Sequence, residues 1–202
     1  MTEQSYVIYG DAISKMSLAR MFIIENLDTI RRGMIEENGT DPIEHYLARI
    51  KSDESMRKKC LKKGLEPTTE NALEKIHDAI GVRVVCPFLN DVYTIGKRLK
   101  ELEDIEVIEE KDYIKHAKPN GYRSYHIITK VMGFYCEIQL RTISMDTWAA
   151  MEHHMKYKRD LGDKEELFVS ELKRLADELA STDISMQTIH DMIYQAKKKE
   201  EK

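Results

Sequence analysis

The sequence predicts an α+β fold in which a mixed β-sheet is flanked by helices, with helical extensions towards both ends of the chain. Two patterns support this class. Apolar residues recur at helical spacing on both sides of the centre, whereas valine-rich and alternating segments fill the centre, joined by hairpin and crossover connections. Of the 202 residues, 42% are hydrophobic, so the chain can bury a substantial core.

The first half of the chain is predicted to contain three helices, a basic segment and one strand. The first helix stops at Asn38-Gly39, because both residues tolerate left-handed backbone conformations. Asp41 and Pro42 then supply the cap and the first residue of a second helix. The predicted elements are a helix over 12–37, a helix over 41–50, a basic helix or loop ending at Gly64, a helix from Thr68 to His77 and a strand over 80–87.

The second half is predicted to begin with a helix, continue through three strands and end in three helices. Met132-Gly133 separates two alternating segments and therefore predicts a tight hairpin. The predicted elements are a helix over 91–102, strands over 105–108, 125–131 and 134–141, a helix from Thr142 to Met155, and two amphipathic helices over 167–179 and 186–193.

Composition and charge exclude several classes of protein. With 32 basic and 36 acidic residues the net charge is −4, which excludes a generally basic nucleic-acid coat protein but not a local basic groove. Cys60, Cys86 and Cys136 lack CxxC spacing, so neither a disulfide framework nor a structural zinc site is expected. No apolar run reaches the roughly 20 residues of a membrane helix and no signal sequence is evident, so we expect a cytoplasmic protein with no membrane partner.

The segment 134–141 alternates between two kinds of side chain. Its apolar residues share one face, while Glu137, Gln139 and Arg141 share the other. This pattern suits an antiparallel strand with one solvated face, and it equally suits a strand that forms the floor of a polar cleft.

Asp78 and Arg83 bracket the start of the valine-rich strand. An arginine in such a strand is costly to bury unless it is paired, so a structural salt bridge to Asp78 or to a neighbour is one interpretation. The other is that Arg83 reaches a ligand while Asp78 binds a metal ion. Magnesium takes carboxylate oxygens together with substrate phosphates, so Asp78 and Glu137 would suffice.

Two further segments suit a nucleotide. Residues 49–63 hold seven basic and two acidic side chains, a local excess that attracts a polyanion such as a triphosphate, although a solvated helix face is also consistent with it. Around the Asn120-Gly121 turn, Lys118, Tyr122 and His126 combine groups that can stack on a base and hold its phosphates.

Taken together, these segments resemble the synthetase domain of the RelA/SpoT family and, by length, its stand-alone small alarmone synthetases. Five motifs match in the family's order from about Tyr46 to Lys158, over half of the chain. The matching residues are Arg49, Lys51, Ser55 and Lys59; Asp78, Gly81 and Arg83; Lys118 to Tyr122 with Ser124 and His126; Glu137 to Thr142; and Trp148, Glu152, His153, Tyr157 and Lys158.

The resemblance implies a mixed-sheet, nucleotidyltransferase-like fold and a Mg²⁺-dependent enzyme. It would transfer pyrophosphate from ATP to the ribose 3′-hydroxyl of GTP or GDP, making the alarmone (p)ppGpp of the stringent response. By the same resemblance, adenine is sandwiched by Arg49 and Arg83, and the ATP phosphates are held by Lys51, Ser55, Lys59 and either Lys62 or Lys63. Mg²⁺ is bound by Asp78 and Glu137, and Glu137 also orients or deprotonates the acceptor hydroxyl. Guanine is stacked on by Tyr122, and the acceptor pocket is shaped by Lys118, Asn120, His126, Gln139 and Arg141.

The resemblance also implies a division of the chain and a set of partners. Residues 1–40 form an N-terminal helical extension, 41–160 the catalytic domain and 161–202 C-terminal helices for homo-oligomerisation, commonly as a tetramer, with intramolecular packing of these helices as the alternative. By the resemblance the product is a candidate activator, whereas the basic segment 49–63 with Tyr122 and Tyr125 makes single-stranded RNA a candidate regulator. We expect no hydrolase domain, although the long members of the family carry one.

Two alternatives remain open at this point. One is a toxin of the same fold that transfers pyrophosphate to the 3′ end of tRNA. The other is a non-enzymatic module for single-stranded RNA that uses the basic segment and Tyr122 with Tyr125. The second alternative leaves Asp78 and Glu137 unexplained, because carboxylates repel phosphates unless a cation intervenes.

Overall fold

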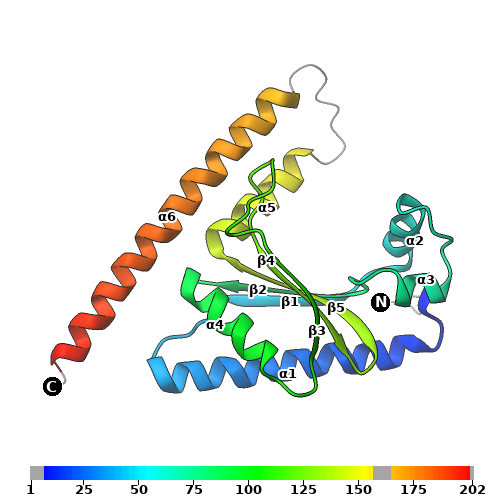
Figure 1. The fold of residues 1–202 in the computed structure, drawn as a ribbon, viewed down its shortest axis with the longest axis horizontal. Helices are drawn as coiled ribbons and strands as arrows, with labels where there is room; N and C mark the ends of the chain where they lie inside the picture. Colours follow the sequence, from blue (N-terminus) through cyan, green and yellow to red (C-terminus); the bar gives the residue numbers. More distant parts are fainter. Residues whose placement is uncertain (1–6, 157–164, 201–202) are drawn as a thin grey trace.

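The computed structural model describes residues 7–156 and 165–200, and its centre is a mixed five-stranded sheet (Figure 1). The strand order is β1-β2-β5-β4-β3; β2 and β5 pair in parallel, and the other neighbours pair antiparallel. This confirms the predicted mixed sheet. Tyr157 and Lys158 of the sequence match lie outside the described residues. The strands are β1 His45–Ile50, β2 Ile80–Cys86, β3 Glu106–Asp112, β4 Tyr125–Val131 and β5 Phe134–Thr142.

The helices lie before, between and after these strands. The first ends where the sequence predicts, at Gly39, which has a φ of 72° and donates its backbone N–H to the carbonyl of Ile35. The Thr68 side chain caps α3 by accepting a hydrogen bond from the backbone N–H of Asn71. The helices are α1 Ala12–Asn38, α2 Asp53–Lys62, α3 Thr69–Glu74, α4 Leu89–Lys100, α5 Ile143–Lys156 and α6 Glu165–Glu200.

The main core lies between the sheet and the helices α1 and α4. The apolar face of β5, with Ile138 and Leu140, packs in the same buried cluster as Leu27 of α1 and Ile95 of α4. Gly96 brings α4 close to the sheet, since a Cβ there would lie 2.6 Å from the Tyr125 ring. Each large aliphatic side chain buried in this way stabilises the fold by about 1.5–3 kcal/mol. The opposite face of the sheet is left for polar side chains.

The segment 41–50 is not the predicted helix. Its second half is β1, the edge strand paired with β2. Asp41 does cap a turn, since its Oδ1 accepts the backbone N–H of Ile43 at 3.1 Å, but no helix follows. Burial then alternates along the strand: Tyr46 is partly covered, whereas Leu47 and Arg49 are exposed. The edge of β2 supplies hydrogen-bond partners that outweigh a helical spacing of only a few apolar residues.

The two predicted C-terminal helices are one continuous helix, α6, of 36 residues. The residues between the two predicted segments include Ser181, Thr182 and Asp183, which favour helix ends. The hydroxyl of Thr182 instead donates to the backbone carbonyl of Glu178 at 3.0 Å inside the helix. No glycine or proline occurs between residues 165 and 200, so nothing forces a break.

The hairpin agrees with expectation. Met132 and Gly133 have φ values of 50° and 86°, the conformation required by a tight two-residue turn between β4 and β5. The three cysteines are buried and carry free thiols. The described helices are all too short or too polar to span a bilayer.

Candidate active site

A polar cleft of about 290 Å³ opens on the face of the sheet opposite α1 and α4. Arg49 on β1 and Glu137 on β5 are both paired with Gly81 on the strand between them. Paired residues point to the same face, so an arginine and a glutamate converge above a residue without a side chain. Asp78 enters from the turn before β2. The cleft is lined by Leu47, Arg49, Lys51, Asp78, Gly81, Val82, Arg83, Glu137 and Gln139.

This arrangement decides between the two interpretations of the alternating strand. Glu137 and Gln139 form part of the cleft floor rather than a plain solvated face. The two predicted metal-binding carboxylates, far apart in the sequence, line one cavity.

Asp78 is held by two lysines. Its Oδ2 lies 3.0 Å from the Lys51 ammonium and also accepts a hydrogen bond from Lys59 of α2. Its Oδ1 is buried and has no hydrogen-bond partner among the described residues. A buried carboxylate oxygen without a partner is costly, so this atom is suited to a ligand or cation that enters the cleft.

Glu137 is a carboxylate that is kept ionised. Burial alone would raise its pKa. The pKa is instead lowered to about 2 by a hydrogen bond with His126 and the charge of that ring, by a hydrogen bond from Gln139 and by the charge of Lys59. The Gln139 amide donates to Glu137 at 2.7 Å, and His126 Nδ1 lies 3.3 Å from its other oxygen. At neutral pH this group carries a full negative charge.

Five side chains close into a ring of polar contacts beside the cleft. From Glu137 the ring runs to His126, whose Nε2 lies 2.9 Å from the Tyr122 hydroxyl. Arg141 donates to that hydroxyl at 2.6 Å and to the side-chain Oε1 of Gln139 at 2.8 Å, and the Gln139 Nε2 donates in turn to Glu137. Each member restrains its neighbours, so the ring fixes the positions of the polar groups around Glu137.

Asp146 is a site residue that sequence reasoning missed. It lies in the first turn of α5 and contacts the guanidinium groups of Arg83 at 3.3 Å and Arg141 at 3.1 Å. The partner of Arg83 is therefore Asp146 and not Asp78. Burial and the nearby charge of Arg141 lower the pKa of Arg83 from its usual value, and its Nε has no partner among the described residues.

An aromatic cluster adjoins the ring. The Lys118 ammonium lies 4.5 Å from the ring centre of Tyr113 and 4.9 Å from that of Tyr122. Tyr113 also meets the His126 ring edge-on at 5.2 Å. Asn120 orders the turn by accepting the backbone N–H of Tyr122 at 3.2 Å. Tyr113 was not among the predicted residues; its position directly after β3 is the signal that could have suggested it.

Comparison with known proteins is consistent with this geometry. Residues 48–162, more than half of the chain, match the family model described as the region found in RelA / SpoT proteins. This chain belongs to the RelA/SpoT family. The resemblance inferred from the sequence motifs is thereby confirmed.

Two curated relatives of this RelA/SpoT protein and one similar solved structure come from Bacillus subtilis. GTP pyrophosphokinase YwaC is 41% identical over 172 residues, covering 79% of this chain and 81% of YwaC. GTP pyrophosphokinase YjbM is 30% identical over 202 residues, covering 96% and 90%. The crystal structure of small alarmone synthetase 1 bound to its product pppGpp has a TM-score of 0.74 at 28% identity, covering 88% of this chain and 93% of that one.

The cleft of this RelA/SpoT chain contains carboxylates that suit a magnesium ion. The part of the chain that the structure describes holds no group of three or more His, Cys, Asp or Glu side chains arranged for a metal. Magnesium is commonly held by one or two carboxylates and by substrate phosphates. Asp78, with its unpartnered oxygen, and the ionised Glu137 supply such a pair.

Three predicted donor-site residues of this RelA/SpoT chain do not line the cleft, namely Ser55, Lys62 and Lys59, and Lys59 reaches it only through its hydrogen bond to Asp78. Ser55 is exposed near the start of α2, where its backbone N–H donates to the hydroxyl of the N-cap residue Ser52 at 3.4 Å. Lys62 is exposed at the other end of the same helix. Neither Ser55 nor Lys62 is among the described residues that line the cleft. Their contact with ATP phosphates stays a prediction.

Proposed function

We propose that this chain is a GTP/GDP pyrophosphokinase that transfers the β,γ-pyrophosphate of ATP to the ribose 3′-hydroxyl of GTP or GDP. The observation that carries the proposal is the shared cleft of Asp78 and Glu137, bordered by basic side chains on one side and an aromatic cluster on the other. The names of the relatives YwaC and YjbM support the same activity.

The donor nucleotide binds on the side of β1 and β2. Arg49 and Arg83 offer planar guanidinium groups on neighbouring strands, which suits stacking on either side of adenine. Lys51 and Lys59 exchange the carboxylate of Asp78 for the phosphates of ATP. Ser55 and Lys62 of α2 are proposed to contact the ATP phosphates as well.

The acceptor nucleotide binds on the side of the aromatic cluster. Tyr122 stacks on guanine, and Lys118 and His126 lie close enough to it to contact the base or its phosphates. Gln139 and Arg141 complete the pocket through the polar ring, with Asn120 ordering the turn.

Glu137 sets the position of the acceptor hydroxyl. The 3′-oxygen forms a bond to the β-phosphorus of ATP, the bond from that phosphorus to the α,β-bridging oxygen breaks, and AMP leaves. A carboxylate with a pKa of about 2 is a weak base, so Glu137 accepts the hydroxyl hydrogen bond and aligns its oxygen, and the proton passes to solvent as the bond forms. When bound, Mg²⁺ neutralises phosphate charge, with Asp78 and Glu137 as its protein ligands.

The proposed catalytic domain is 41–160, with α1 completing its core. Helix α6 has four large apolar side chains that are 51–66% exposed, namely Ile184, Met186, Ile189 and Met192. Their exposure supports assembly with further copies of this chain, and we propose a tetramer. Its nucleotide substrates are consistent with a cytoplasmic enzyme. Product activation remains a proposal from the family resemblance, and RNA regulation a proposal from the basic segment 49–63 with Tyr122 and Tyr125.

Acceptor-dependent release of AMP tests the proposed function. The protein is incubated with ATP and Mg²⁺ and with GDP, GTP or bulk tRNA in parallel, and AMP is quantified by anion-exchange chromatography. We expect AMP to form only with GDP or GTP, in equal amount to the guanosine product. AMP formed only with tRNA would favour the toxin, and no AMP with any acceptor would favour a binding module.

A further inference from the structure

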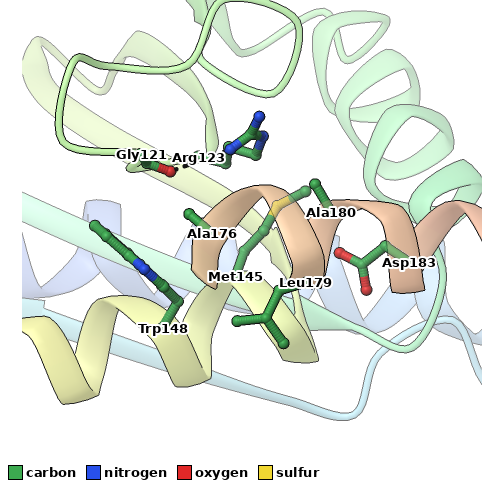
Figure 2. A pocket seen from close by; sticks show the side chains of 8 residues that line it. All are labelled: Gly121, Arg123, Met145, Trp148, Ala176, Leu179, Ala180 and Asp183. Atoms are coloured by element: carbon green, nitrogen blue, oxygen red, sulfur yellow. Dashed lines mark hydrogen bonds between the residues drawn. The ribbon is translucent and has the colours of Figure 1, made fainter. Parts of the chain in front are cut away.

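The turn proposed to bind the acceptor, residues 118–124, lies directly against α6 (Figure 2). Gly121 has a φ of 92°, and a Cβ built there would lie 2.7 Å from the Cβ of Ala176 and 3.0 Å from the Cα of Lys173. Only glycine allows this conformation and so close an approach to a helix backbone. We call residues 118–124 the acceptor loop.

An ion pair holds the same loop to α6. The Arg123 guanidinium lies 3.0 Å from Asp177 and donates to the backbone carbonyl of Gly121 at 3.3 Å, so it joins the loop's own backbone to the helix. The Arg123 side chain is 18% exposed and that of Asp177 47%. The pair therefore acts at the edge of the contact, where water partly screens it.

The aromatic residue of the loop packs on the same helix. Tyr122 contacts the small buried cluster formed by Trp148 of α5 and by Leu172 and Ala176 of α6. The Trp148 indole N–H donates to the backbone carbonyl of Leu172 at 2.8 Å and so fastens α5 to α6. The back of Tyr122 is thus supported by α6, while its hydroxyl belongs to the polar ring beside Glu137.

We propose that Ala176 and Asp177 of α6 are positioning residues for the acceptor nucleotide. They hold the acceptor loop against α6 and thereby fix the positions of Tyr122 and Lys118, which contact the acceptor in the proposed function. The proposal rests on the proposed function. The donor side depends on β1, β2, α2 and the turn before β2, so a change at 176 or 177 acts on the acceptor and leaves ATP binding alone.

Steady-state kinetics with each substrate varied in turn tests this proposal. Asp177→Asn removes the partner of Arg123, and the matched control Glu178→Gln makes the same charge change one residue on, where the pair is with Arg174. We expect Asp177→Asn to raise KM for GDP about threefold, as for an edge ion pair. Ala176→Leu forces the acceptor loop away from α6 and is expected to raise KM for GDP about tenfold or more. KM for ATP changes by less than about twofold, Asp177→Glu restores the GDP value and Glu178→Gln leaves both unchanged.

Amide hydrogen exchange over 118–124 in the free protein gives a second readout that needs no turnover. We expect faster exchange of this peptide in Asp177→Asn and Ala176→Leu than in the wild type and Glu178→Gln. An unchanged KM for GDP with unchanged exchange, or an equal rise of both KM values, would overturn the positioning role. A wild-type protein that makes no guanosine product would instead overturn the proposed function, and the exchange data would still decide the role of α6.

Discussion

Replacing Glu137 by Gln removes one negative charge from the cleft while keeping the size of the side chain. The carboxylate accepts a hydrogen bond from Gln139 at 2.7 Å and contacts His126 at 3.3 Å. An amide retains one acceptor oxygen but loses the charge that strengthens both contacts. Charged hydrogen bonds contribute about 1.5–3 kcal/mol and neutral ones about 0.5–1.5, so the fold loses on the order of 1–2 kcal/mol and survives.

The effect on pyrophosphate transfer is expected to be much larger than the effect on binding. A misplacement of the reacting group by about 1 Å costs about 10²-fold in rate, which corresponds to about 3 kcal/mol of the barrier. We therefore expect kcat for Glu137→Gln to fall by about 100-fold or more. The Arg49, Arg83 and Tyr122 contacts proposed for the two bases are unchanged, so both nucleotides should still bind.

Rapid-quench measurement of the guanosine product, beside calorimetric binding of GDP and of a non-hydrolysable ATP analogue, separates the two effects. Glu101→Gln is a matched control, because Glu101 is exposed at the C-cap of α4 and pairs only weakly with Lys97 at 3.8 Å. Turnover of Glu137→Gln close to that of the control would refute the role of Glu137. A parallel collapse of nucleotide affinity would refute the separation of binding from transfer.

Three further predictions follow from the site. The pKa of Glu137 is about 2 in the fold and about 4.3 in an unfolded chain, so its stabilising effect is complete above about pH 4.3 and is lost as the pH falls towards 2. Between pH 6 and pH 3 the free energy of unfolding, measured in urea, should therefore fall by about 2 kcal/mol less in Glu137→Gln than in the wild type, and parallel curves would contradict the depressed pKa. Asp78→Asn should lower kcat at least about 100-fold and raise the Mg²⁺ concentration needed for half-maximal turnover, since one proposed ligand loses its charge; a Mg²⁺ titration that superimposes on that of the wild type would exclude Asp78 from the metal site. Tyr122→Ala should raise KM for GDP by about fivefold to 100-fold through lost base stacking, whereas Tyr122→Phe keeps the stacking surface; equal effects of the two variants would mean that the hydroxyl, not the ring, carries the binding.

The cleft floor could be predicted from the sequence because it depends on a local rule. The period of two along 134–141 separates the apolar residues from Glu137 and Gln139, and a neighbouring strand can only pair in a way that keeps each face intact. The valine-rich β2 and the hairpin at Met132-Gly133 are equally local signals.

The donor side shows where local rules fail. The spacing of Ile43, Tyr46 and Ile50 suits a helix, and in a helix Arg49 and Lys51 would point about 200° apart. In β1 and its continuation the two residues share a face and line one cleft. The pairing of β1 with β2 decides this, and it is a tertiary contact that the spacing of these apolar residues cannot reveal.

The missed residues and the long helix have the same kind of cause. Asp146 matters because α5 carries it to two arginines from different strands, and Tyr113 because the loop after β3 meets β4. The local pattern shows neither contact, and only the position of Tyr113 directly after β3 indicates that this residue could matter. The continuity of α6 depends on the absence of a strong breaker and on its packing against α5, which outweigh the weak helix preference of Ser181 and Thr182.

A crystal structure of the chain with a non-hydrolysable ATP analogue, GDP and Mg²⁺ tests the central claim most directly. The account predicts the ATP phosphates beside Lys51, the guanosine 3′-hydroxyl within hydrogen-bond distance of Glu137, and the metal ion in contact with Asp78. Nucleotides bound away from this cleft, or a metal ion that contacts neither carboxylate, would contradict it.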